Sequence, residues 1–281
     1  MKTNLLLDKL MERAADRDLN PILLEFTLSH CHSLFYMKYE RFYQSVGVHE
    51  EEASAFLNAL DFSSFQEFTE FVRSETYRAE EDSLKGLDEL SRVSQTVHGI
   101  VEYELNNLQS LMRNEEVHEN IAKLAQDMID SQGIVFIGMR IAAPLATYAS
   151  MLFNKIGIEA SAIDSLGMNA TEVISKIDRS KPIIALGFSR YSKVTVILLR
   201  MLKEQGNKII AITDFPTSPL AKLADYSIFL DVSSHDFTDS FAAPFSLLSI
   251  LATYIVNEKK DAAFYHLAKF EESAAALEYF I

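Results

Sequence analysis

The chain has few of the features that mark secreted or membrane proteins. Its single cysteine, Cys31, excludes an intramolecular disulfide and is typical of a reducing compartment. No apolar run approaches the roughly 18 residues that a bilayer crossing requires. The run at Leu5–Leu7 ends after three residues, so we expect no secretory signal. We therefore expect a cytoplasmic protein without a membrane partner.

Basic residues are also scarce. The 281 residues include 26 Lys and Arg against 40 Asp and Glu, which gives a formal net charge of −14. Such a charge disfavours non-specific binding to nucleic acid or to anionic membranes unless a basic patch is concentrated somewhere.

The pattern of apolar residues changes near the middle of the chain. Residues 1 to about 116 contain three glycines and no β-branched runs, and they read as helix throughout. From Gly133 onward, strand-like and helical runs alternate, which predicts a parallel sheet covered on both faces. We expect strands at Gly133–Gly138, Gly157–Ile163, Pro182–Phe188, Lys208–Thr213 and Tyr226–Leu230. We expect helices at Ala143–Lys155, Met168–Lys176, Tyr191–Gln205, Pro219–Leu223, Phe241–Asn257 and Ala262–Phe280.

Two helical segments offer apolar surface for self-association. The segment Thr76–Val117 is interpreted as one long connecting helix, and Phe241–Val256 is an apolar helix near the C-terminus. Together they present more apolar surface than one sheet face can cover, so we expect a homodimer or a dimer of dimers.

The loop after the third expected strand is a candidate anion site. Pro182–Phe188 is followed by Ser189-Arg190-Tyr191-Ser192 and then by a helix. Hydroxyls and free backbone N–H groups at a helix N-terminus suit a phosphate. An ordinary helix cap would also place a serine here.

Four stretches of the C-terminal half resemble the sugar isomerase (SIS) domain, a phosphosugar-binding module, over roughly Asn120 to Lys259. They are Ile134–Ala143, Ile183–Thr195, Gly206–Asp214 and Ser218–Asp225. The resemblance implies a flavodoxin-like, five-stranded parallel sheet with helices on both faces. It also implies a phosphosugar-like ligand without a further cofactor, bound by Arg140, Ser165, Ser189, Arg190, Tyr191, Ser192 and His235.

The match to the SIS pattern is incomplete at the ligand loops. Ile141 and Ala142 stand where the family often has small or hydroxyl residues, Gly187 replaces the first loop serine, and Arg190 occupies the usual glycine. Arg140 and Arg190 could each contact a phosphate through two parallel hydrogen bonds. Arg140 could equally pair with a carboxylate at a subunit contact.

The N-terminal half resembles the helix-turn-helix domain of RpiR/MurR-type transcriptional regulators. The match runs from Phe42–Val48 through Ala53–Leu60 to Phe62–Phe68, with Gly47 at the turn. Phe56, Leu60, Phe62, Phe65 and Phe68 are spaced to fill a small core. The resemblance implies three parts: a helix-turn-helix-like domain at 1–76, a linker helix at 77–117 and the SIS domain at 118–281.

The expected recognition helix, His49–Leu60, is acidic where a DNA-reading helix is usually basic. No Lys or Arg lies between Gly47 and Val72, while Glu50, Glu51 and Glu52 open the helix. These carboxylates repel phosphate, although they also suit the positive end of the helix dipole. Candidate DNA contacts are Lys38, Arg41, His49, Ser54 and Asn58, with Arg73 and Arg78 beyond the turn.

Evidence for catalysis or a metal site is weak. Glu172, His235 and Asp236 are the remaining candidates for the base that an aldose–ketose isomerase requires, and Val194 stands where sugar-handling relatives often have an acid. His30-Cys31-His32 would point its ligands to different faces of a helix, and no second cluster completes a zinc site.

We expect a regulator with an effector-sensing SIS domain. A SIS protein that has lost DNA binding is the main alternative, and an isomerase is the third.

Overall fold

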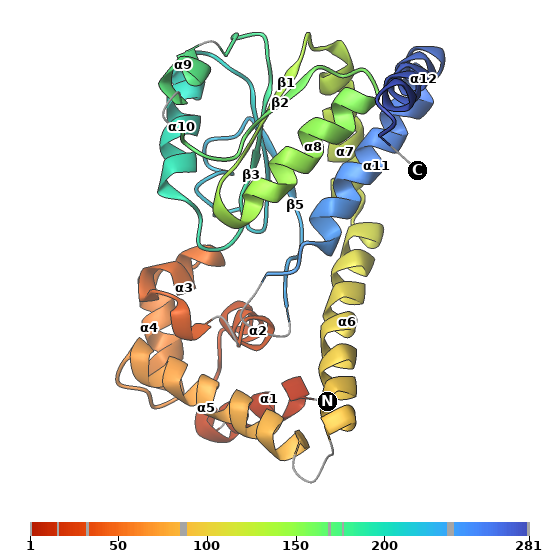
Figure 1. Cartoon of the computed structure of the whole chain (residues 1–281). Helices are drawn as coiled ribbons and strands as arrows, with labels where there is room; N and C mark the ends of the chain where they lie inside the picture. The colour runs from red at the N-terminus through yellow and green to blue at the C-terminus, as the bar shows by residue number, and fades with distance from the viewer. Residues whose placement is uncertain are drawn as a thin grey trace. The chain divides into compact units, whose positions relative to one another are not determined.

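The computed structural model describes residues 2–15, 17–31, 34–84, 89–167, 170–175, 177–234 and 239–279. The chain divides into two compact units. The first comprises Met1–Asn107 and Ser233–Ser240, and the second comprises Leu108–Val232 and Phe241–Ile281. Figure 1 shows the helices and strands of each unit.

The described part of the first unit is helical, as expected. Its elements are α1 (Lys2–Ala14), α2 (Pro21–Ser29), the short 3-10 turn η1 (Leu34–Tyr36), α3 (Tyr39–Ser45), α4 (Glu50–Ala59), α5 (Phe65–Leu84) and most of α6 (Glu89–Arg113). Gly47 has a φ of +75° in the turn between α3 and α4, a conformation that glycine adopts without a steric cost.

Aromatic rings fill the core of this unit. Phe42 of α3 is fully buried, and its ring centroid lies 5.0–6.2 Å from those of four other phenylalanines, Phe26, Phe56, Phe65 and Phe68. The expected core residues Phe56, Leu60, Phe62 and Phe68 are all buried, whereas Phe65 is half-buried. Tilted and edge-on ring pairs of this kind stabilise a small core beyond the area they bury.

The segment expected as one connecting helix, Thr76–Val117, belongs to three helices. The structure describes α5 as far as Leu84 and α6 from Glu89 to Arg113. A new helix, α7 (Glu115–Asp130), then begins behind Asn114, whose side chain accepts a hydrogen bond from the N–H of Val117 at 3.2 Å. An asparagine cap of this kind ends one helix and starts the next.

The second unit is built on a parallel sheet. Its strands are β1 (Ile134–Gly138), β2 (Ala160–Ile163), β3 (Ile183–Leu186), β4 (Ile209–Thr213) and β5 (Tyr226–Phe229), in the order β2-β1-β3-β4-β5 with every neighbouring pair parallel. Its helical elements besides α7 are η2 (Arg140–Ala142), α8 (Ala143–Lys155), α9 (Ala170–Ser175), α10 (Lys193–Glu204), α11 (Ala242–Lys259) and α12 (Asp261–Ala276).

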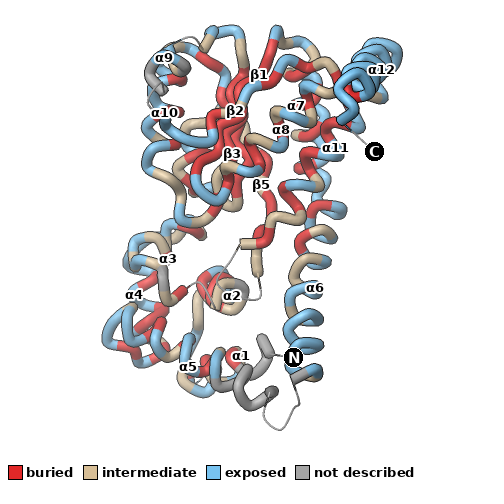
Figure 2. The backbone as a smooth tube through the Cα atoms, in the orientation of Figure 1, coloured by how far each residue is buried: buried red, intermediate tan, exposed pale blue. Residues whose placement is uncertain are grey.

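Helices cover both faces of this sheet (Figures 1 and 2). Ile134 and Phe136 of β1 pack into one core with buried residues of α7, α8 and α11. Val135 and Ile137 point to the opposite face and pack with Leu198, Leu199 and Leu202 of α10. The alternation follows from the two-residue period of a strand, and burial on both faces explains why β1 is apolar at every position.

Several details of this unit differ from expectation. Pro219–Leu223 forms turns rather than a helix, in a short segment where the Ser218 hydroxyl accepts from the N–H of Ala221 at 3.0 Å. Helix α10 begins at Lys193, two residues after the expected start at Tyr191. Among the described helices, none combines the length and the apolar composition needed to cross a membrane.

Candidate functional site

The strand order reverses beside β1, which has β2 on one side and β3 on the other. In open parallel sheets, the loops at the carboxyl ends of the strands diverge at such a point and leave a crevice for ligands. Here the loops that follow β1, β2 and β3 begin at Met139, Asp164 and Gly187.

These three loops line a pocket of about 710 Å³. Its lining residues are Met139, Arg140, Ala143, Asp164, Ser165, Leu166, Arg190, Tyr191, Ser192, Lys193 and Val194. The pocket therefore brings together five of the residues that the sequence nominated: Arg140, Ser165, Arg190, Tyr191 and Ser192. Ser189 is not among the lining residues, and His235 lies outside the described part of the chain. A role in ligand binding stays a prediction for each of them.

Ser192 caps helix α10. Its hydroxyl oxygen accepts from the N–H of Thr195 at 3.4 Å, while its own O–H remains a donor that can face an anion. The N–H groups of Lys193 and Val194 belong to the first turn of the helix, where backbone donors lack helical partners and the dipole is positive. Both the capping and the anion-binding interpretations of this serine are therefore compatible with its position.

Asp214, directly after β4, holds the β3 loop in place. Its carboxylate accepts from the N–H of Ser189 at 2.8 Å and from the hydroxyl of Tyr191. The Thr213 hydroxyl and the N–H of Phe215 also donate to it, each at 3.1 Å. Burial raises the pKa of the Asp214 carboxyl, and these hydrogen bonds oppose the shift. The N–H of Ser189 is consequently directed at Asp214 rather than at the pocket.

Both pocket arginines have left-handed backbone conformations. The φ angle is +58° at Arg140 and +64° at Arg190. Residues other than glycine occupy this region at an energetic cost. The conformation explains why a glycine would suit position 190, and it turns the backbone sharply where each loop leaves its strand.

The described residues of the pocket lining carry a net positive charge. Arg140, Arg190 and Lys193 contribute three cations, and Asp164 contributes one carboxylate. Sequence reasoning missed Lys193 and Asp164, although both lie next to nominated serines. The hydroxyls of Thr147 and Ser165 donate to Asp164 at 2.9 and 3.1 Å. Glu172, an expected candidate for a catalytic base, does not line the pocket.

The first unit has a hollow on the surface of α4. It measures about 870 Å³ and is lined by His49, Glu50, Glu51, Ser54, Ala55 and Asn58. Three of the nominated DNA contacts, His49, Ser54 and Asn58, thus share one surface with two glutamates. The other two are Lys38, the exposed residue before α3, and Arg41, a half-buried residue of α3.

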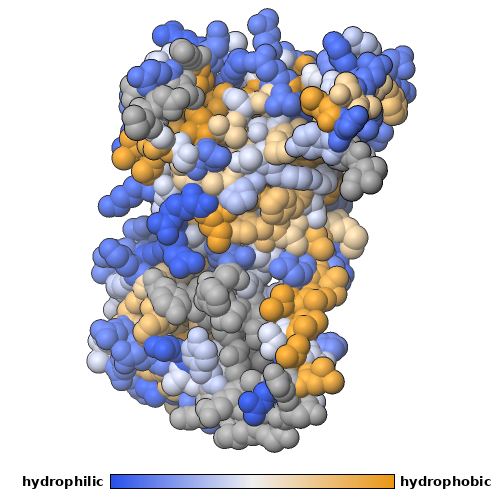
Figure 3. All heavy atoms as spheres, viewed as in Figure 1, coloured by the Kyte–Doolittle hydropathy of each residue, from blue (hydrophilic) through white to orange (hydrophobic). Residues whose placement is uncertain are grey.

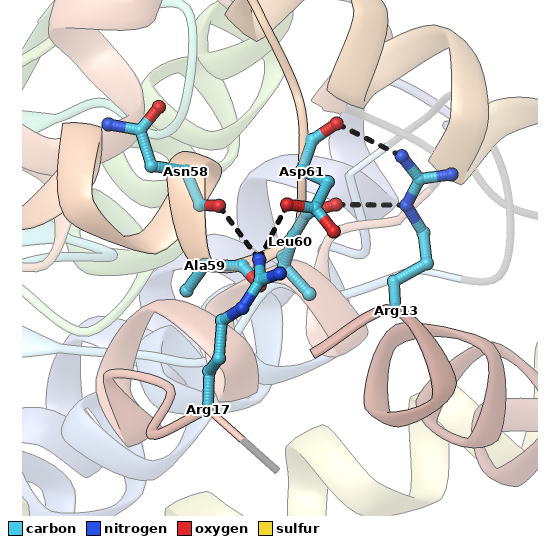
Figure 4. A network of polar contacts seen from close by, with 6 residues as sticks. All are labelled: Arg13, Arg17, Asn58, Ala59, Leu60 and Asp61. Carbon is cyan, nitrogen blue, oxygen red and sulfur yellow. Dashed lines mark hydrogen bonds and ion pairs between the residues drawn. The ribbon is translucent and has the colours of Figure 1, made fainter. Parts of the chain in front are cut away.

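Two arginines bind the C-terminal end of α4 (Figure 4). Arg13 of α1 donates to the carbonyl of Leu60 at 2.9 Å, and Arg17 donates to the carbonyl of Ala59 at 3.0 Å. Arg17 also forms an ion pair with Asp61 at 2.6 Å, which lowers the pKa of that carboxyl. Cations at this end complement the negative pole of the helix dipole. Sequence reasoning missed this network because its partners are more than 40 residues apart.

Of the two cations nominated beyond the turn, Arg73 contacts an aromatic ring. The guanidinium of Arg73 lies 4.2 Å from the ring centroid of Phe35, and nothing is described of the Arg78 side chain. In the first unit, 10 Lys and Arg stand against 22 Asp and Glu, so this unit carries −12 of the net charge of −14.

The run His30-Cys31-His32, at which we expected no metal site, begins at the end of α2. His30 Nδ1 lies 3.1 Å from the carbonyl oxygen of Phe26, Cys31 is half-buried, and His32 lies outside the described residues. No group of three or more His, Cys, Asp or Glu side chains arranged to hold a metal ion occurs in the ranges that the structure describes.

Known proteins are similar to the chain over both of its halves. Over 245 residues, 84% of this chain and 86% of the relative, the sequence is 25% identical to an uncharacterised HTH-type transcriptional regulator of Clostridium perfringens. The sugar isomerase domain of an RpiR transcription factor from Sphaerobacter thermophilus superposes with a TM-score of 0.57 at 20% identity, over 64% of this chain and 97% of that one. The Vibrio vulnificus NanR protein complexed with ManNAc-6P superposes with a TM-score of 0.59 at 13% identity, over 97% and 98% of the two chains.

These structural likenesses confirm the expected fold. A family model described as the SIS domain matches residues 127–254, which include all five strands and the whole pocket lining. The chain therefore carries a SIS domain in its C-terminal half.

Proposed function

We propose that the protein is an RpiR-type transcriptional regulator whose SIS domain senses a phosphosugar or a similar anionic carbohydrate derivative. The observation that carries this proposal is the pocket at the carboxyl ends of β1, β2 and β3. Its described lining includes three cations, one carboxylate and the N-terminus of α10, a combination that suits an anionic ligand. The named function of the Clostridium perfringens relative and the ManNAc-6P complex of the Vibrio vulnificus neighbour support it.

The mechanism follows from linkage. A ligand that binds one arrangement of a homodimer more tightly than another shifts the population toward that arrangement. In a dimeric regulator, the shift changes the spacing of the two DNA-binding domains and hence the fit to two half-sites. A cytoplasmic location belongs to this proposal, and DNA as a partner and a single cysteine, Cys31, support it.

Contacts to DNA must come chiefly from outside the exposed glutamates of α4. Lys38 and Arg41 on the α3 side are the nearest nominated cations, with His49, Ser54 and Asn58 as polar contacts. Few neutralised phosphates mean weak binding with a shallow dependence on salt. The test is fluorescence anisotropy with the protein's own promoter fragment, from about 50 to about 200 mM salt.

A charge-swap variant tests whether α4 faces DNA. Glu51→Lys combined with Glu52→Thr should raise the affinity for DNA and steepen its salt dependence, because two repulsive carboxylates leave and one cation arrives. The matched control is Glu25→Lys with Asp18→Thr, which makes the same charge change at exposed positions elsewhere in the unit. Equal gains in both variants would show that only the net charge matters.

The acidity of the first unit favours one alternative, a SIS-domain protein that has lost DNA binding and works as a ligand sensor or protein-interaction module. No binding to the promoter fragment at the lowest salt, together with ligand binding by the SIS pocket, would support this alternative over the regulator.

We propose a sensor rather than an isomerase because, among the residues that the structure describes, the pocket lining offers Asp164 as its carboxylate and contains no histidine or glutamate. Incubation with fructose 6-phosphate or ribose 5-phosphate, followed by separation of aldose from ketose, tests this. Catalysed interconversion that is lost in Asp164→Asn would overturn the assignment.

A further inference from the structure

The cation content of the SIS pocket exceeds what one phosphate group needs. A phosphate monoester carries a charge of about −2 at neutral pH. The N-terminus of α10 already supplies backbone donors and the positive end of a dipole. Lys193 is the first residue of this helix, and Arg190 lies on the loop that precedes it. Arg140 is additional, because it belongs to the loop that follows β1.

The two arginines approach the pocket from neighbouring strands. Gly138, the last residue of β1, is paired in register with Leu186, the last residue of β3. Adjacent strands lie about 4.8 Å apart. The two loops therefore enter the pocket side by side, and each places one arginine, with a left-handed backbone, on its lining.

The pocket carboxylate does not neutralise these arginines. Asp164 accepts hydrogen bonds from the hydroxyls of Thr147 and Ser165, and no ion pair between described residues joins it to Arg140 or Arg190. Both arginines are exposed. A left-handed backbone conformation has an energetic cost for residues other than glycine. In this pocket two residues adopt it, and both are arginine, the residue type best suited to bind oxyanions through paired hydrogen bonds.

We propose that the ligand of this pocket carries two anionic groups: a phosphate at the N-terminus of α10, beside Arg190 and Lys193, and a second group, carboxylate or phosphate, at Arg140. The inference rests on the proposed function and narrows it, because it selects bisphosphorylated sugars and phosphorylated sugar acids over simple sugar monophosphates. Leu166, Val194 and Met139 line the pocket with apolar surface for the carbon skeleton between the two groups.

The test uses two matched pairs of probes in isothermal titration calorimetry with the full chain. One pair is fructose 6-phosphate and fructose 1,6-bisphosphate, and the other is glucose 6-phosphate and 6-phosphogluconate. The doubly anionic member of at least one pair should bind about tenfold or more tightly than its partner, the scale of one charged hydrogen-bonded contact. The pair that shows the preference identifies the second group as phosphate or carboxylate.

Variants assign the preference to Arg140. Arg140→Gln should remove the preference while changing the affinity for the monophosphate by less than about threefold, and Arg140→Lys should retain part of the preference. Arg200→Gln, on the exposed side of α10 and outside the pocket lining, makes the same charge change and should leave the preference intact. Melting curves establish that each variant is folded.

Different results would overturn the doubly anionic ligand and the phosphosugar-sensing function on which it rests. Equal affinity for both members of both pairs, or a preference that survives in Arg140→Gln, overturns the inference and leaves a monophosphate sensor standing. If none of the four probes binds or raises the melting temperature, both the inference and the phosphosugar-sensing function are overturned.

Discussion

Ser189 and Ser192 lie three residues apart, and the structure gives them different surroundings. The N–H of Ser189 is held by Asp214, and its side chain is not part of the pocket lining. Ser192 lines the pocket and caps α10. In the sequence both serines belong to the same turn. Only the structure shows that Ser189 helps to hold the loop, whereas Ser192 can contact a ligand.

This difference predicts unequal effects of substitution. Ser192→Ala should weaken binding of a sugar phosphate such as fructose 6-phosphate by about 1–3 kcal/mol, because a donor to a charged group is lost. Ser189→Ala should cost less than about 0.5 kcal/mol, since the backbone N–H that Asp214 accepts is retained. Calorimetric titration of the two single variants measures the difference. Equal losses would show that both hydroxyls contact the ligand.

Gly157 follows α8 at a point of close approach. Its φ is +83°, and a Cβ atom added there would lie 2.1 Å from the ring of His266 on α12. We expect Gly157→Ala to lower the free energy of unfolding by about 2–4 kcal/mol, from overpacking and backbone strain together. Gly206 is the matched control, because its φ is +93° but no atom lies within 4 Å of the added Cβ. Gly206→Ala should cost only about 1 kcal/mol in urea denaturation.

Asp214 shows the limit of sequence reasoning at single residues. It stands in a recognisable position after a strand, yet its four donors come from its own neighbours and from the separate loop after β3. A carboxylate at the end of a strand could serve a ligand, a metal or a loop equally well. Only the distances identify it as the residue that orders the β3 loop.

The positions of the strands were predictable because parallel strands buried on both faces are continuous apolar runs. All five expected strands are present, each shortened by one to three residues at one or both ends. The break at Asn114 was harder to predict, because asparagine is tolerated within a helix as well as at its cap. The Pro219–Leu223 segment carries helical residue types but is too short to continue beyond a turn.

The ion pair between Arg17 and Asp61 at the C-terminal end of α4 makes the stability of the protein depend on pH. The ion pair with Arg17 lowers the pKa of Asp61, so the stabilisation from this pair is present above the ordinary aspartate pKa and is lost as the pH falls through the lowered one. Between about pH 5 and about pH 3, wild-type protein should therefore lose more stability than Asp61→Asn, which has no charge to lose.

Thermal unfolding of both proteins across this pH range measures the effect. Asp18→Asn serves as a control for removal of an exposed acid elsewhere in the first unit. Parallel stability curves for wild-type and Asp61→Asn would show that the Arg17 pair contributes nothing in solution, as is common for exposed ion pairs.

At the scale of the molecule, apolar residues line one face of α6. Leu90, Val93, Val97, Ile100, Val101 and Leu105 are each between 45% and 78% exposed, and Figure 3 shows apolar side chains along this helix. Their spacing of three and four residues places them on one side of the helix. A contiguous exposed stripe of this kind is typical of a subunit interface.

We expect the protein to form a homodimer in dilute solution, with this stripe contributing to the interface. Light scattering at micromolar concentration should return about twice the chain mass of 31.7 kDa. Val93→Gln combined with Val97→Gln should shift the protein toward monomer, whereas Ile197→Gln with Met201→Gln, at exposed positions on α10, should not. A wild-type mass of one chain would contradict the expectation.

The division of the chain into two units determines which fragments of the protein can be expected to fold. The chain leaves the first unit after Asn107, returns to it at Ser233 and leaves again after Ser240. Within that unit, the side chain of Asn107 donates to the carbonyl of Ser233 at 2.7 Å, and the hydroxyl of Ser240 donates to Glu104. A fragment that starts at Leu108 would keep the segment Ser233–Ser240 but lose the helix that anchors it. An expression fragment of the sensor should therefore begin near Glu89, so that α6 is kept whole.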